Sequence, residues 1–285
     1  MFELLQNADD NSFKKAIEQR KAPYIAFRLY SDRIVVECNE DGFTYEDLKA
    51  ISTVGKSSKA ESLGYIGEKG IGFKSVFMVA WKVTIQSGNF SFFFKHRRKD
   101  QGLGMIRPIW VEPSEKLPLN MTRMTLQLHA DSPEELESQR QMIRQQLEDL
   151  EETFLLFTRK LNEIRVSIYD KDDDEKLESH ATFSIQPHDV NCRALIKQVN
   201  RNGEEITTSQ IYHLTTHVYN LDRSENHTHS AKAGRPQTDA QSQIILGFPL
   251  SVDSAPIESY QKVYAFMPMK ESGFKVRRNQ ITQVP

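Results

Sequence analysis

A glycine-rich loop constrains this chain more than any other stretch. It spans residues 64–75, Gly-Tyr-Ile-Gly-Glu-Lys-Gly-Ile-Gly-Phe-Lys-Ser, and leads into an apolar segment, 76–81, that we expect to be helical. Gly67, Gly70 and Gly72 permit positive φ angles and a close approach of the backbone to a ligand. Amides at the start of a helix attract anions. The loop therefore predicts a phosphate site with room for a triphosphate.

Two familiar phosphate-binding motifs fit this loop poorly. Its spacing is Gly-x-x-Gly-x-Gly, which differs from the Gly-x-Gly-x-x-Gly of dinucleotide-binding folds. Gly55, Lys56 and Ser57 come close to a P-loop, but Ala50 stands at its first position and residues 44–51 read as a helix. A flexible connection without a ligand remains an alternative, because such a loop alone is weak evidence.

Length and charge limit the classes of protein to consider. At 285 residues the chain is long enough for two modest domains with a proper core. It has 37 Lys and Arg residues against 39 Asp and Glu, for a formal charge of -2. Composition therefore gives no reason to expect nucleic acid or an anionic membrane as an obligatory partner.

The cysteines and the N-terminus indicate an intracellular protein, cytoplasmic or nuclear. Cys38 and Cys192 are the only two cysteines, which favours reduced thiols over a disulfide framework. The first residues lack the order of a secretion signal, and no apolar run approaches the roughly 18 residues of a membrane span. We expect a soluble protein without membrane contact.

The first segment reads as an amphipathic helix over residues 2–20. Its apolar residues recur at threes and fours, namely Phe2, Leu5, Ala8, Phe13, Ala16 and Ile17. Glu3, Asn7 and Asp10 stand at i, i+4 and i+7, which places two carboxylates and an amide along one side. A plain solvated face is the alternative for this row.

A hairpin, a turn and a short helix follow. Strand-like runs at 24–30 and 33–38 are separated by two turn residues. The second run ends at the polar turn 39–43, and Thr44 then begins a capping pattern for a helix through Ile51. The serine-rich segment 53–62 predicts a mobile lid over the ligand of the glycine loop.

The rest of the first half predicts strands. Residues 83–87 and 90–95 flank Gly88-Asn89, a strong hairpin signal, and 105–111 and 121–129 read as further strands. The basic tip at 96–99 is read as a solvated turn, with a phosphate or nucleic-acid contact as the alternative.

A charged helix from Ser132 to about Lys160 is expected to join two domains. The segment beyond it is strand-rich, with runs at 164–169, 181–185, 194–199, 210–219, 243–250 and 262–267. Residues 220–242 carry His227 and His229 and read as a disordered loop, because two close histidines without another ligand rarely make a metal site.

Three segments occur in the order and spacing of a known superfamily. They are residues 3–10, the turn at 39–43 and the loop at 64–75. Together they resemble the nucleotide-binding boxes of the gyrase, heat-shock chaperone, histidine kinase and MutL (GHKL) ATPase superfamily. With Gly55-Lys56-Ser57 they look most like the sacsin and NO VEIN type of chaperone-like ATPase domain.

The resemblance implies an α+β fold class. A Bergerat-type α/β sandwich at residues 1–130 would bind ATP with Mg²⁺. A connecting helix at 131–160 and a strand-rich α+β second domain at 161–285 would follow. ATP would close the lid at 53–70, and client proteins would be further partners.

The resemblance also assigns roles. Glu3 would be the general base for the attacking water, and Asn7 would bind Mg²⁺ through its side-chain oxygen. Asp10 would face the nucleotide, and Thr122 would match the threonine of the last box. The other nucleotide-binding positions are Gly42, Lys56, Ser57, Gly67, Lys69, Gly70, Ile71, Gly72 and Phe73.

Two positions depart from the superfamily pattern. The aspartate that accepts a hydrogen bond from the adenine amino group is matched by Asn39, with Asp41 as the alternative. The glycine before the last-box threonine is Met121.

The chain also begins two residues before Glu3, where relatives carry a segment that supports the helix and often joins two subunits. It ends soon after 263–268, a stretch that resembles the start of the region supplying a phosphate-sensing basic residue. These features favour a weak, slow ATPase. The alternative is a non-hydrolysing or degenerate nucleotide-binding module with a structural role.

Overall fold

The structure is a computed structural model that describes residues 1–52, 72–98, 100, 107–113, 115–201, 203–220, 241–257, 260–265 and 267–275. The helices are α1 (Phe2–Asp10), α2 (Lys14–Glu18), α3 (Tyr45–Ile51) and α4 (Pro133–Glu148), with 3-10 helices η1 (Gly72–Met78) and η2 (Glu152–Phe157). The strands of the first half are β1 (Tyr24–Leu29), β2 (Arg33–Cys38), β3 (Ala80–Ser87), β4 (Phe90–Lys95), β5 (Ile109–Trp110) and β6 (Thr122–Leu128). The later strands are β7 (Glu163–Tyr169), β8 (Leu177–Asp189), β9 (Cys192–Arg201), β10 (Glu204–Asn220), β11 (Gln241–Leu250), β12 (Tyr260–Ala265) and β13 (Met267–Lys275).

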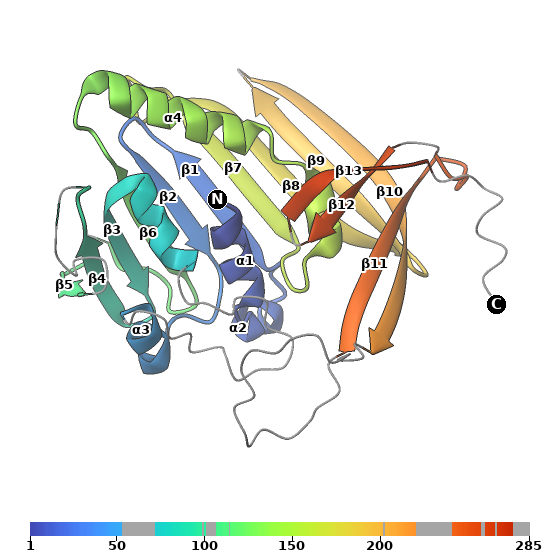
Figure 1. Ribbon diagram of the computed structural model, residues 1–285, viewed down its shortest axis with the longest axis horizontal. Coiled ribbons are helices and arrows are strands. Elements are labelled where there is room, and N and C mark those ends of the chain that lie inside the picture. The colour runs from blue at the N-terminus through green and yellow to red at the C-terminus, as the bar shows by residue number, and fades with distance from the viewer. Residues whose placement is uncertain are drawn as a thin grey trace, which may run out of the picture. The chain divides into compact units, whose positions relative to one another are not determined.

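One mixed sheet dominates the described chain (Figure 1). Eleven strands run in the order β11-β10-β9-β8-β7-β1-β2-β6-β3-β4-β5, and β12 pairs with β13 in a separate two-stranded sheet. The pairing of β1 with β7 is parallel, whereas β1 with β2 and β2 with β6 are antiparallel. A strand-rich fold with one very wide sheet results.

The expected Bergerat-type sandwich followed by a separate strand-rich domain is wrong. Strands expected in the second domain continue the sheet of the first, because β7 lies beside β1 with Phe27 opposite Val166. Periodicity identifies β7 as a strand but says nothing about its neighbour. Parallel partners need a long crossover, here the chain through α4, and a crossover leaves no local signal in either strand.

The described residues cluster into two compact units. The first comprises Met1–Gln186, Leu195–Ser209 and Tyr264–Met269, and the second comprises the described parts of Pro187–Ala194, Gln210–Val263 and Lys270–Pro285. The segment 131–160, predicted to connect two domains, falls inside the first unit. All the predicted site residues that the structure describes also belong to that unit.

Two predicted helices are shorter than expected. The pattern over 2–20 divides into α1 and α2, because the carboxylate of Asp41 accepts hydrogen bonds from the Ser12 hydroxyl (2.5 Å) and the Lys15 amide (2.9 Å) and thereby starts α2. The helix expected to reach Lys160 ends at Glu148 and is followed by η2. No proline or glycine in the sequence marks either of these helix ends.

Other local predictions are confirmed. The hairpins of β1 with β2 and of β3 with β4 form as expected. In the turn between β3 and β4, Gly88 takes the positive φ of 57° that such a turn requires. The capping box of α3 is present, since Thr44 accepts from the Asp47 amide and Asp47 accepts from Thr44. The segment after the glycine loop is η1 and then β3, in place of the expected helix over 76–81.

One face of β1 contributes some of the most deeply buried side chains to the core of the first unit. Ile25, Phe27 and Leu29 alternate along β1 and are at most 1% exposed. Burying each such side chain stabilises the fold by roughly 1.5–3 kcal/mol. The register places Glu37 opposite Ala26 on the other side of the sheet, where it pairs with Arg28 (2.6 Å). This alternation explains why a strand can bear both core residues and ion pairs.

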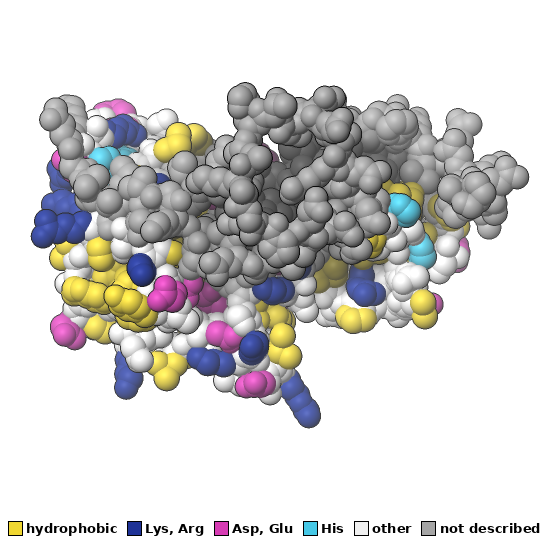
Figure 2. All heavy atoms as spheres, turned by 60° about the horizontal axis from the view of Figure 1, so that its bottom comes forward, with side chains coloured by type: hydrophobic (Ala, Val, Ile, Leu, Met, Phe, Trp, Pro, Cys, Tyr) yellow, Lys and Arg dark blue, Asp and Glu magenta, His cyan; other side chains and the backbone are white. Residues whose placement is uncertain are grey.

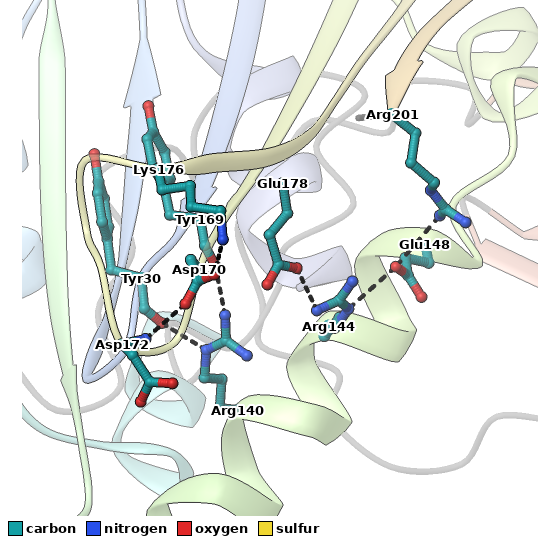
Figure 3. A network of polar contacts seen from close by, with 10 residues as sticks. All are labelled: Tyr30, Arg140, Arg144, Glu148, Tyr169, Asp170, Asp172, Lys176, Glu178 and Arg201. Carbon is teal, nitrogen blue, oxygen red and sulfur yellow. Dashed lines mark hydrogen bonds and ion pairs between the residues drawn. The ribbon is translucent and has the colours of Figure 1, made fainter. Parts of the chain in front are cut away.

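Arginines of α4 fasten that helix to the sheet (Figure 3). Arg140 is 3% exposed and donates to the carbonyl oxygens of Tyr30 (3.1 Å) and Tyr169 (2.5 Å), at the ends of β1 and β7. Arg144 pairs with Glu178 at 2.6 Å. The helix thereby ties two parallel strands together.

Some apolar residues remain at the surface. In Figure 2 hydrophobic side chains gather on the side where Figure 1 draws β4 and β5, and Ile109, Trp110 and Val111 are exposed in this part of the chain. The Trp110 ring packs edge-on against Phe92, with centroids 5.7 Å apart. No helix among the described residues is long and apolar enough to cross a membrane.

Candidate functional site

The structure describes part of the predicted site. Lys56, Ser57, Gly67, Lys69, Gly70 and Ile71, together with the lid at 53–70, lie outside the described residues. So do His227, His229 and Lys99. The remaining predicted residues stand on α1, on η1, at the end of β2 and at the start of β6.

Glu3 and the last glycine of the loop lie against each other. Glu3 is exposed on α1, and a Cβ atom added to Gly72 would collide with its carboxylate. Asn7 and Asp10 are half-buried further along the same helix. The structure therefore brings the predicted general base to the C-terminal end of the predicted phosphate loop, two segments far apart in the sequence.

Phe73 holds the start of η1 in place. Its ring lies 6.5 Å from that of Phe77 and 6.2 Å from that of Phe94 on β4. These aromatic contacts anchor the chain directly after Gly72 to the sheet. The contacts of Phe73 in this structure are therefore packing contacts.

Asp9, next to the predicted Asp10, is a structural anchor that sequence reasoning missed. Its carboxylate is 2% exposed and accepts hydrogen bonds from the backbone amides of Arg159 (2.9 Å), Lys160 (2.8 Å) and Leu161 (3.0 Å). One signal was available, because Asp9 stands at i+4 from the buried Leu5 and so lies on the apolar side of the helix pattern. A carboxylate in that position needs donors from elsewhere in the fold.

Asn39, the predicted adenine contact, has both polar ends engaged by the backbone. Its side-chain oxygen accepts from the Tyr24 amide at 2.8 Å, and its side-chain nitrogen donates to the Ala22 carbonyl at 2.9 Å. The residue is 3% exposed. It joins the end of β2 to the start of β1.

Asp41, the alternative adenine contact, is also engaged. Burial alone would raise the pKa of Asp41, but hydrogen bonds from the Ser12 hydroxyl and the amides of Lys15 and Lys14 outweigh it and hold the pKa below its usual range. Gly42 follows with a φ of 87°, and a Cβ atom there would lie 2.8 Å from the Leu119 carbonyl oxygen. This glycine is required by the backbone itself.

Glu40, between these two residues, belongs to a buried polar chain. The amide of Phe43 donates to the Ser87 hydroxyl (2.8 Å), which lies 2.5 Å from the Thr122 hydroxyl, and Thr122 donates to the carboxylate of Glu40. Glu40, Ser87 and Thr122 are 4%, 2% and 2% exposed. The predicted last-box threonine therefore donates to Glu40, at the end of β2, a residue that was not among the predicted site residues.

Sequence reasoning missed Glu40 and Ser87. Glu40 lies inside the polar turn 39–43 that the sequence analysis identified. The sequence shows that it is an acid but does not show where its side chain points. Ser87 lies opposite Thr122 in the register of β3 and β6, a pairing that no local pattern states. The contacts of both residues depend on the pairing of strands in the sheet.

Lys74 is a further cation beside the loop. Its ammonium donates to the Ile51 carbonyl and lies 4.8 Å from the centre of the Phe94 ring. Burial lowers the pKa of Lys74 to about 8. Lys74 thus brings an amino group, held by a carbonyl oxygen and an aromatic ring, to the stretch directly after the glycine loop.

Helix α1 carries side chains with oxygen donors, the ligand type that Mg²⁺ takes. Among the described residues no three His, Cys, Asp or Glu side chains gather into a metal site. Mg²⁺ needs no such cluster in nucleotide sites, because it takes one or two protein oxygens and completes its shell with phosphates and water. The side-chain oxygen of Asn7 is of that kind.

Comparison with known proteins adds one relative. No family model matches the chain. It is 44% identical over 115 residues to Protein NO VEIN of Arabidopsis thaliana. Over that stretch the chain is NO VEIN-like. The stretch is 40% of this chain and 4% of the Arabidopsis protein, so the chain spans a small part of that relative.

Proposed function

We propose that this chain is an Mg²⁺-dependent ATP-binding module of a chaperone-like ATPase of the GHKL superfamily. The observation that carries the proposal is the contact of Glu3 with Gly72, which joins the two boxes that the resemblance assigns to water activation and phosphate binding. The NO VEIN-like stretch supports the sacsin and NO VEIN type. The wide sheet carries this site without the sandwich that the resemblance implied.

The base of the nucleotide is assigned to Glu40. The adenine amino group needs an acceptor, and the carboxylate bound to Thr122 is a better candidate than Asn39, whose side chain joins two strands. An amino group facing a carboxylate gains a charge-assisted hydrogen bond. The chain Ser87–Thr122–Glu40 would then form the polar floor of the base pocket.

The phosphate end is assigned to α1 and η1. Asn7 would hold Mg²⁺, which supplies charge neutralisation on the phosphates when bound. Glu3 would orient the attacking water and take its proton, and Lys74 would add positive charge beside the loop. Since Gly72 has no side chain, the Glu3 carboxylate can occupy this position.

Paired variants test the assignment at the phosphate end. Gly72→Ala puts a Cβ atom into the space that the Glu3 carboxylate occupies and so pushes the end of the phosphate loop away from α1, and we expect ATP affinity to fall about tenfold in calorimetry. Glu3→Ala should leave affinity within about twofold and lower phosphate release by at least about a hundredfold, as loss of a general base does. Glu18→Ala, which removes an exposed acid from α2, should change neither. Unchanged affinity in Gly72→Ala would contradict the placement of the phosphates.

A non-hydrolysing module is the second candidate. Asn39 and Asp41 were both expected to contact the nucleotide, but their side chains bind backbone groups. This favours a module in which some of the expected binding residues have a structural role. Binding of ATP with no phosphate release above that of the Glu3→Ala variant would establish this candidate. Release that depends on Glu3 would exclude it.

A further inference from the structure

The outer strand of the wide sheet is an unusual edge. β11 lies in the second compact unit and ends the strand order, so among the described strands it is hydrogen-bonded to β10 alone. It is ten residues long, whereas β5 at the other end of the order has two. Its register with β10 runs from Ile211 opposite Leu250 to Asn220 opposite Gln241 without a bulge. A long, regular edge presents many backbone groups for pairing.

The backbone direction of the free edge follows from the turn after β11. The amide of Ile257 donates to the Pro249 carbonyl (2.9 Å), and the amide of Ser251 donates to Ala255 (2.7 Å). Pro249 and Ser251 therefore point away from β10. Because backbone groups alternate along a strand, Gly247, Ile245 and Gln243 point their N–H and C=O groups the same way.

The side chains of this edge carry nothing that blocks pairing. Residues 241–248 include no charged residue and no proline, the two means by which native edges are most often protected. Ile244 and Leu246 lie on one face and are 46% and 49% exposed. An uncharged strand of high β-propensity is a template for another strand.

We propose that β11 pairs antiparallel with β11 of a second copy of this chain, about a two-fold axis at Ile245. In this register Ile245 lies opposite its own counterpart and exchanges both hydrogen bonds with it, and Gln243 and Gly247 pair across the axis. The turn after Pro249 already occupies the edge there, so the stretch that has no further partner among the described strands is 241–248, and its midpoint lies beside Ile245.

The exposed side chains favour a second copy as the occupant. Ile244 of one copy lies opposite Leu246 of the other, twice, so each exposed apolar residue covers an apolar residue. An occupant strand must be free of charge at these positions, and β11 itself meets that condition. A closed two-fold pairing also leaves no edge for further growth.

Sedimentation velocity of the full chain, without nucleotide, tests this pairing. A two-strand interface is small, so we expect dimers to appear between about 1 and 100 µM. Leu246→Lys should leave the protein monomeric throughout that range, because it sets a charge against Ile244 of the other copy. Val218→Lys, at an exposed position on β10, is the matched control and should dimerise like the unaltered chain.

A double variant tests the register. In I244E/L246K opposite charges face each other across the proposed axis, so the dimer should return at low salt. Antiparallel registers centred one residue away would set like charges against each other and keep the variant monomeric. Monomeric unaltered protein at 100 µM, dimers unaffected by Leu246→Lys, open-ended assembly, or a double variant that stays monomeric while circular dichroism shows it folded would each overturn the proposal.

Discussion

On α1 the predicted site residue is exposed and an unpredicted residue holds the fold, whereas at the end of β2 the predicted residues hold the fold. On α1 the residue predicted for chemistry, Glu3, stays exposed beside Gly72, while Asp9, near the other end of the same helix, is buried and accepts hydrogen bonds from three backbone amides of a distant segment. In this region the residue predicted for chemistry lies beside the predicted phosphate loop.

At the end of β2 the predicted residues are the ones that hold the fold. Asn39 and Asp41 bind backbone groups, and Glu40 between them reaches Thr122 in the core of the sheet. The difference teaches that residue type and spacing do not settle which member of a polar motif holds the fold, because side-chain direction decides that. Each region predicts a different outcome when its residues are changed.

Loss of Asp9 should have the largest effect on stability. Asp9→Ala leaves three amides of the 159–161 segment without their acceptor, and hydrogen bonds to a charged group contribute about 1.5–3 kcal/mol each in net terms. Partial hydration of the segment limits the total, so we expect the free energy of unfolding to fall by about 3 kcal/mol in urea denaturation. Glu18→Ala should change it by less than about 0.5 kcal/mol.

Asn39 should matter for stability and little for ATP. Asn39→Ala leaves the Tyr24 amide and the Ala22 carbonyl without partners, at a cost of about 2 kcal/mol. Asn39→Asp should also destabilise, because a carboxylate cannot donate to Ala22. If Asn39→Asp instead raised ATP affinity, the adenine contact would belong at position 39 after all.

Glu40 should show the converse behaviour. Glu40→Gln keeps an acceptor for Thr122 but removes the charge, so stability should change by less than about 1 kcal/mol. The hydrogen bond from adenine loses its charge assistance, and we expect ATP affinity to fall about tenfold in calorimetry, which corresponds to about 1.4 kcal/mol. GTP, which lacks the amino group at that position, serves as the comparison ligand and should bind both proteins weakly.

The smallest effect concerns Lys74 and pH. Its pKa is lowered by burial from 10.5 to about 8, so between these values the unfolded chain binds more protons than the folded one. Stability should therefore rise with pH from about 8 upward, by about 1 kcal/mol once partial exposure is taken into account. Urea denaturation at pH 7.5 and 9.5 should show this rise in the unaltered chain and a smaller one in Lys74→Met.

Local patterns predicted much of this chain. Gly88-Asn89 marked a hairpin, the Thr44 capping box marked α3, and the polar row on the first helix began with Glu3, which lies against Gly72. Each of these features depends on residues within a few positions of one another. That is the range over which propensity, capping and turn chemistry act.

The rest depends on pairing between distant strands. Nothing near Glu163 states that β7 will lie parallel to β1, and nothing near Ser87 states that it will meet Thr122. The break between α1 and α2 is made by Asp41, which comes from the far side of the β1–β2 hairpin. These contacts set which polar residues are buried, and so they decide the roles within each motif.

Calorimetric titration of the chain with ATP in the presence of Mg²⁺ tests the central claim most directly. We predict saturable one-site binding, abolished by chelating the metal, and a rise in Tm that grows with ATP concentration, since a ligand that prefers the native state stabilises it. No heat and no rise in Tm at about 1 mM ATP, with a folded protein that unfolds cooperatively, would contradict the account.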